Sequence, residues 1–120
     1  MPSLLGLRVF VLEDESHIAM LIEDMLCDLG CEITATAERV ADALRAVDDN
    51  GFDVAVLDVN LAGEQSFPVA ERLRAEAIPF VFSTGYGVLG VREDLRTAPV
   101  IAKPFDQEEL GAALVAAMNR

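Results

Sequence analysis

Three short apolar runs in this sequence end in charged residues, and this pattern constrains the fold more than any other. The runs and the residues that follow them are 9–12 with Glu13 and Asp14, 54–57 with Asp58, and 100–102 with Lys103. Continuous Val, Leu and Ile runs of this length are typical of strands buried on both faces of a parallel sheet. Because the carboxyl ends of parallel strands lie along one edge, we expect three carboxylates and one ammonium to meet there.

Helical patterns alternate with these strands along the chain. The predicted strands are residues 9–12, 32–37, 54–58, 80–83 and 100–102, and the predicted helices include residues 18–29, 40–47, 68–73 and 110–118. Helix-end signals support these limits, with Gly30 and Asn50-Gly51 as stops, Ser66 as an N-cap and Asp106 with Glu109 as a capping box. This order predicts a doubly wound (βα)₅ α/β fold, a three-layer sandwich of the flavodoxin-like kind.

One stretch breaks the regular order. Residues 85–98 begin with three glycines within six positions, and only residues 91–95 offer a turn or so of helical pattern. Glycine lowers helix stability, so we expect the fourth helix to be short, irregular or mobile. Residues 59–64, which lead into Ser66, are expected to form a loop.

Length and charge restrict the class of protein. The chain has 120 residues, which suits a single domain over 1–120, with no linker, repeat or output domain visible. Its 21 acidic and 9 basic residues give a net charge of −12, which disfavours nucleic acids and anionic lipids as partners. No apolar stretch approaches the roughly 20 residues of a membrane span, and the first eight residues lack the features of a signal peptide. We therefore expect a cytoplasmic domain.

The expected cluster of acids needs something that offsets its repulsion. A raised pKa, a salt bridge to Lys103 or a divalent cation would each do so. Oxygen ligands without nearby His or Cys favour a hard cation, and Mg²⁺ is the usual one where phosphate chemistry follows. A carboxylate beside Mg²⁺ can attack a phosphoryl group, while the Lys103 ammonium and the Thr84 hydroxyl contact its other oxygens.

On these motifs the chain resembles response-regulator receiver domains, the CheY-like family of two-component signalling. The resemblance covers essentially the whole length, through Glu13-Asp14, Asp58, Thr84 and Lys103-Pro104-Phe105. It implies that Asp58 accepts a phosphoryl group from a sensor histidine kinase and that phosphorylation changes binding of a downstream signalling protein or phosphotransferase. It further implies roles for the matching positions: Asp14 as a direct Mg²⁺ ligand, Glu13 through water, Asn60 through its backbone carbonyl, Lys103 and Thr84 on the phosphoryl group, and Gly85 as the small residue beside it.

The segment after the fourth strand suggests a subfamily. Residues 82–87 are similar to the Phe-Ala-Thr-Gly signature of the single-domain FATGUY regulators, with Ser83 in place of Ala, and Val100 stands where many receivers carry an aromatic residue. Regulators of that type pair with histidine kinases of the HWE or HisKA_2 type. Tyr86, two positions beyond the switch residue, is a candidate for shielding an acyl phosphate from water.

Other functions stay open at this point. A flavodoxin-like cofactor module is disfavoured, because acidic residues stand where its phosphate-binding loop would be. A Mg²⁺-dependent phosphohydrolase that forms an aspartyl phosphate is the enzymatic alternative, although 120 residues leave little material for a substrate cap. The chain could also be the receiver of a hybrid kinase that acts as a phosphate sink. The receiver reading predicts no enzyme in the ordinary sense, only self-catalysed phosphoryl acceptance and slow loss.

Overall fold

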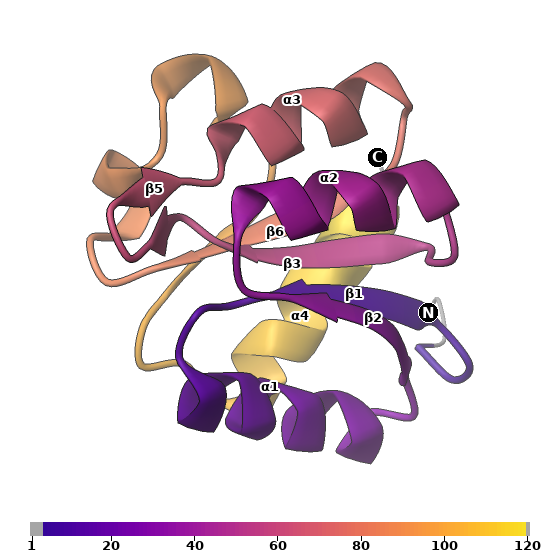
Figure 1. Ribbon diagram of the computed structural model, residues 1–120. Coiled ribbons are helices and arrows are strands. Elements are labelled where there is room, and N and C mark those ends of the chain that lie inside the picture. The colour runs from indigo at the N-terminus through magenta and orange to yellow at the C-terminus, as the bar shows by residue number, and fades with distance from the viewer. Residues whose placement is uncertain (1–3, 120) are drawn as a thin grey trace.

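A five-stranded parallel sheet forms the centre of the protein in a computed structural model that describes residues 4–119 (Figure 1). Its strands are β1 (Arg8–Leu12), β2 (Glu32–Ala37), β3 (Val54–Asp58), β6 (Phe80–Thr84) and β7 (Val100–Ala102). They lie in the order β2-β1-β3-β6-β7, and every pair is parallel. The predicted strands match these limits to within one residue. Residues 1–3 and Arg120, which belong to the predicted domain and its N-terminal segment, lie outside the described residues.

Four α-helices cover the two faces of the sheet (Figure 1). The helices α1 (Ser16–Asp28) and α4 (Gln107–Met118) pack on one face, and α2 (Val40–Asp49) and α3 (Phe67–Ala75) pack on the other. This arrangement confirms the predicted three-layer, doubly wound α/β fold. Within residues 4–119, no helix combines the length and apolar character needed to cross a membrane.

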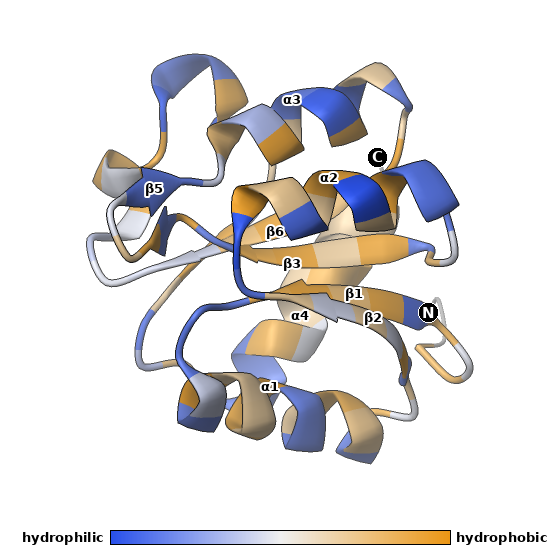
Figure 2. Cartoon of the chain, in the orientation of Figure 1, coloured by the Kyte–Doolittle hydropathy of each residue, from blue (hydrophilic) through white to orange (hydrophobic). Residues whose placement is uncertain are grey.

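The sheet separates two apolar layers, which explains the apolar strands and amphipathic helices in the sequence. Side chains of α1 and α4 meet one face at Ile22, Leu26, Leu110 and Leu114. The other layer joins α2, α3 and the segment after β6, and it includes Val47, Leu73, Phe82, Val91 and Leu95. Figure 2 shows largely hydrophobic strands between helices in which hydrophilic and hydrophobic residues are mixed. Burial on both faces makes the central strands continuous Val and Leu runs.

The segment that was expected to hold an irregular fourth helix contains two short 3₁₀ turns. These are η1 (Gly87–Gly90) and η2 (Glu93–Leu95), and they confirm the expectation. Gly87 adopts a φ of 62°, a left-handed conformation that a residue with a side chain rarely takes. Val91 and Leu95 are each 1% exposed and fix the segment to the core, whereas Leu89 is 81% exposed.

The connection between β3 and α3 differs from the loop that the sequence predicts. It forms a small antiparallel hairpin of β4 (Asn60–Leu61) and β5 (Glu64–Gln65). Ala62 and Gly63 make the turn with φ values of 50° and 94°. Strands of two residues carry no periodicity, and Ala is an uncommon residue at a left-handed turn position, so no sequence pattern predicts this hairpin.

The helices end near the predicted residues, but only some of the predicted capping interactions form. Asp106 and Glu109 form the predicted capping box at the start of α4. Asn50 rather than Gly51 takes the left-handed position that ends α2. Ser66 stands at the predicted N-cap of α3, but its hydroxyl makes no cap hydrogen bond and is buried without a partner.

Candidate functional site

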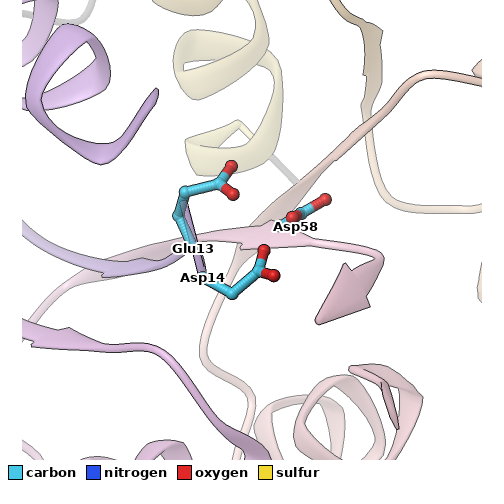
Figure 3. Close-up of side chains that lie close together, drawn as sticks. All are labelled: Glu13, Asp14 and Asp58. Atoms are coloured by element: carbon cyan, nitrogen blue, oxygen red, sulfur yellow. The ribbon is translucent and has the colours of Figure 1, made fainter. Parts of the chain in front are cut away.

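Three carboxylates meet at the carboxyl edge of the sheet, as the strand ends predict. Glu13 and Asp14 follow β1, and Asp58 is the last residue of β3 (Figure 3). One oxygen from each of the three lies within 4.8 Å of the others. The chain leaves β1 toward β2 and leaves β3 toward β6 on the opposite side, so the cluster lies where the strand order reverses. Such switch points are where doubly wound sheets bind ligands.

Lys103 joins two of these carboxylates. It is the only lysine in the chain, and its Nζ lies 2.8 Å from Glu13 Oε1 and 3.3 Å from Asp58 Oδ1. The backbone N–H of Lys103 donates to the Thr84 carbonyl at 2.9 Å, which fixes the lysine beside the end of β6. Glu13, which is 2% exposed, also accepts from the Glu15 backbone N–H at 3.2 Å through Oε2. Glu13 is therefore the main partner of Lys103 in this state.

The cluster holds more acid than one lysine compensates. Burial raises the pKa of Asp58 to about 7, with the Glu13 carboxylate adding to the rise and Lys103 opposing it. Burial also disfavours the charged form of Lys103, but Glu13 and Asp58 outweigh this effect and raise the pKa of the ammonium. The lysine thus stays charged while Asp58 is poised between its two forms near neutral pH. A second positive charge at the cluster would favour the ionised form of Asp58.

The donor set fits a hard divalent cation. Glu13, Asp14 and Asp58 offer oxygen atoms only, and Mg²⁺ prefers one or two carboxylates together with waters. Asp14 is partly exposed and makes no hydrogen bond or ion pair within residues 4–119, so its oxygens are free to ligate. Glu13 is occupied by Lys103 and by the Glu15 backbone. Asn60 lies two residues beyond Asp58, exposed, at the start of the β4–β5 hairpin.

The predicted switch residue lies at the end of the neighbouring strand. Thr84 ends β6 and is 2% exposed, and its Oγ1 accepts a hydrogen bond from the Tyr86 backbone N–H at 3.1 Å. The hydroxyl is thus engaged with the following loop. Gly85 has open space around it, and Tyr86 is 76% exposed. The roles assigned to Gly85 and Tyr86 stay predictions.

Two neighbours of the cluster were not identified as site residues from the sequence. Ser83 pairs in register with Asp58 across β3 and β6, and its hydroxyl is buried without a partner. Gly90 lies against the Thr84 side chain, where an added Cβ would be 2.7 Å from Oγ1. The sequence shows Gly90 only as a helix breaker, because a contact across six residues of irregular chain leaves no periodic signal.

The fold and site together define a doubly wound α/β domain with an acidic cluster at its switch point, whose oxygen atoms fit a divalent cation. The sequence profile of the response regulator receiver domain matches residues 9–115. The chain therefore belongs to the response regulator receiver domain family. Transcriptional regulatory protein TcrA of Mycobacterium tuberculosis is 35% identical over 123 residues, which cover 96% of this chain and 47% of TcrA. The chain thus spans about half the length of the curated relatives it matches.

Solved structures agree with this assignment. The solution structure of SdrG from Sphingomonas melonis Fr1 has a TM-score of 0.84 and 44% identity, covering 98% of this chain and 99% of SdrG. The BeF₃-activated conformation of SdrG has a TM-score of 0.79 with 44% identity, covering 97% of this chain and 98% of SdrG. The response regulator PhyR from Brucella abortus has a TM-score of 0.82 and 28% identity, covering 96% of this chain and 49% of PhyR.

Proposed function

We propose that this chain is a phosphorelay receiver that accepts a phosphoryl group on Asp58 from a phosphohistidine of a sensor kinase. An Asp58 oxygen forms the new bond to phosphorus, the phosphorus–nitrogen bond of the phosphohistidine breaks, and the histidine retains the electron pair and takes up a proton. The observation that carries this proposal is the position of Asp58, which is 6% exposed at a strand end, 3.3 Å from the Lys103 ammonium and in one cluster with Asp14. Catalysis of this kind rests on positioning and charge neutralisation.

A Mg²⁺ ion would bind to Asp14 and Asp58, with Glu13 acting through water and Asn60 through its backbone carbonyl. The ion supplies positive charge that neutralises the oxygens of the transferring phosphoryl group. The free oxygens of Asp14 and the acid-rich cluster support this ligand set. Lys103 contributes a second positive charge, and it exchanges part of its pairing with Glu13 for the phosphoryl group.

Phosphorylation would be transmitted through Thr84 and the segment that follows it. The Thr84 hydroxyl leaves the Tyr86 N–H and donates to a phosphoryl oxygen, with Gly85 leaving room beside the group. Tyr86, just before η1, and Val88 and Leu89 within it are 76%, 48% and 81% exposed. They form a surface on which a downstream signalling protein or phosphotransferase would dock. Tyr86 would shield the acyl phosphate once the turn has moved.

We also propose a subfamily for this receiver domain. A single-domain regulator of the FATGUY type, with an HWE or HisKA_2 kinase as donor, is supported by the two 3₁₀ turns in place of a fourth helix. The match to 99% of SdrG supports residues 1–120 as a receiver domain that forms one unit. Such a protein takes up one phosphoryl group and loses it slowly, so we expect no turnover of small phosphoesters.

Intact mass spectrometry after incubation with acetyl phosphate and Mg²⁺ tests the proposal. We expect one added phosphoryl group in the wild type and none in Asp58→Asn or in the presence of a chelator. Asp53→Asn is the matched control, because Asp53 lies just before β3 at the opposite end and pairs with Arg8 at 2.9 Å. Phosphorylation of Asp58→Asn, or chelator-resistant phosphorylation of the wild type, would contradict the proposal.

A further inference from the structure

The Thr84 hydroxyl contacts two residues of the segment that follows it, Tyr86 and Gly90. Its Oγ1 accepts from the Tyr86 backbone N–H at 3.1 Å. Gly90 also lies against this hydroxyl: a Cβ added there would be 2.7 Å from Oγ1, 3.6 Å from Thr84 Cβ and 3.1 Å from Tyr86 Cβ. Separations under 3.0 Å do not occur for real Cβ atoms, so this position of the hydroxyl requires that residue 90 has no side chain.

The requirement concerns space and not backbone conformation. Gly90 is not among the residues with a positive φ, so alanine there meets no backbone strain. The 2.7 Å contact with Thr84 Oγ1 therefore has to be relieved by rotation of the Thr84 side chain or by a movement of the turn, and the 3.1 Å contact with Tyr86 Cβ requires a small shift of either residue. Thr84 carries an oxygen, a methyl group and a hydrogen on its Cβ, and rotation relieves the contact only when the hydrogen faces residue 90. In that rotamer the hydroxyl has left the Tyr86 N–H.

We infer that Gly90 is a positioning residue that holds the switch in its unphosphorylated state, an inference that rests on the proposed function. Because residue 90 has no Cβ, the Thr84 hydroxyl can lie against the turn and accept the hydrogen bond from the Tyr86 N–H. Thr84 is only 2% exposed in this position, which we call the stored position of the hydroxyl. Phosphorylation has to break this bond before the hydroxyl can reach the phosphoryl group. Gly90 thereby sets the free-energy difference between the two positions of the hydroxyl.

The Gly90→Ala substitution should raise the affinity for a phosphoryl analogue. Gly90→Ala excludes the stored position of the hydroxyl and leaves the position used on the phosphoryl group. A ligand that binds the activated state then no longer has to break the Thr84–Tyr86 hydrogen bond. The variant should bind a phosphoryl analogue more tightly, and the gain should depend on the Thr84 hydroxyl.

Titration with beryllofluoride and Mg²⁺, followed by ¹⁹F NMR of the bound fluoride, measures this effect. We expect the midpoint for Gly90→Ala to lie about fivefold below that of the wild type, in line with the loss of one hydrogen bond from the unliganded state. In a Thr84→Ala background the same substitution should change the midpoint by less than about twofold. Gly51→Ala is the matched control, because Gly51 also has no positive φ and an added Cβ there meets nothing within 4 Å.

The outcomes separate the inference from the proposed function. A wild type that binds no beryllofluoride, or an Asp58→Asn variant that binds it equally, overturns the proposed function. A wild type that binds through Asp58, with Gly90→Ala unchanged or weakened, overturns the role of Gly90 alone. An equal gain with and without the Thr84 hydroxyl also overturns it, because the effect then does not act through Thr84.

A second measurement applies even when Gly90→Ala fails to fold. Three-bond couplings of the Thr84 methyl carbon report its χ1 rotamer in the wild-type protein loaded with Mg²⁺. We expect one rotamer before beryllofluoride is added, with the Tyr86 amide protected from hydrogen exchange, and a different rotamer with loss of that protection afterwards. Rotamer averaging or an unprotected Tyr86 amide before activation would overturn the inference.

Discussion

At the scale of single residues, Asp58 combines burial with a proposed role as phosphoacceptor, which requires the charged carboxylate. Its pKa of about 7 lies above the ordinary value of 3.8, first because it is buried and then because Glu13 lies beside it. Between pH 3.8 and about 7, the Asp58 carboxyl therefore holds its proton more often in the folded protein than in the unfolded chain. The free energy of unfolding therefore falls as the pH rises through this window. We expect this contribution of Asp58 to make the metal-free protein less stable at pH 8 than at pH 5.

Removing the carboxylate should reverse this loss. We expect Asp58→Asn to be about 1–2 kcal/mol more stable than the wild type at pH 8 without metal, a figure reduced for screening at the open sheet edge. The difference should shrink as the pH falls toward 4. Urea unfolding at several pH values in chelator measures it. Asp53→Asn provides a control of opposite sign, since the hydrogen bond from Arg8 lowers the pKa of Asp53 and the stability it adds is lost as the pH falls.

Lys103 should matter for stability as well as for chemistry. Lys103→Met leaves Glu13, which is 2% exposed, without its cation, and we expect a loss of about 2–3 kcal/mol at neutral pH. Arg45→Met removes the same charge from an exposed pair with Asp42 and should change little. Urea unfolding compares the two. Adding Glu13→Gln to Lys103→Met should recover part of the loss, and simple additivity of the two substitutions would refute their coupling.

At the scale of the elements, two different sequence patterns predict the sheet strands. Residues 54–58 form β3, which is buried throughout and therefore appears in the sequence as a continuous apolar run. Residues 32–37 form the edge strand β2, where exposed and more buried residues alternate, and the sequence shows a weak alternation with β-branched residues. The β4–β5 hairpin could not be predicted, because its strands have two residues each and its turn uses Ala62. The Ser66 cap shows a further limit, since a sequence gives the position of a hydroxyl but not whether a donor lies within reach.

The irregular segment between β6 and β7 should depend on its buried contacts. Leu95 is 1% exposed and packs into the layer formed with α3, so Leu95→Ala should lower the free energy of unfolding by about 2–4 kcal/mol. Leu89, in the same segment, is 81% exposed, and Leu89→Ala should change stability by less than about 0.5 kcal/mol. Urea unfolding of the two variants tests this difference. Equal effects would mean that the segment is not fixed to the core by Leu95.

At the scale of the whole molecule, the topology brings together residues that lie far apart in sequence. Lys103 and Glu13 are separated by 90 positions, yet their side chains are 2.8 Å apart. The sequence could predict that the three carboxylates and the lysine meet, because strand ends share one edge. It could not predict that Lys103 pairs first with Glu13, or that Gly90 contacts Thr84. Those contacts depend on the positions of individual side chains, which the order of residue types along the sequence does not predict.

The net charge of the molecule bears on its partners. At −12, the chain favours association with basic protein surfaces and repels other acidic ones. A phosphoryl group adds negative charge at the cluster, where Lys103 provides the only lysine ammonium of the chain. The proposed function therefore requires that Mg²⁺ and Lys103 neutralise the charge of the phosphoryl group. It also requires that Asp58 is the carboxylate that carries the phosphoryl group.

Borohydride reduction of the phosphorylated protein, followed by peptide mass mapping, tests that identity most directly. Borohydride converts an aspartyl phosphate to homoserine and leaves free carboxylates unchanged. We predict homoserine at position 58 after treatment with acetyl phosphate and Mg²⁺, and an unmodified peptide when the metal is chelated. Reduction at Asp14 or Glu13 in place of Asp58, or no reduction in protein that has gained the phosphoryl mass, would contradict it.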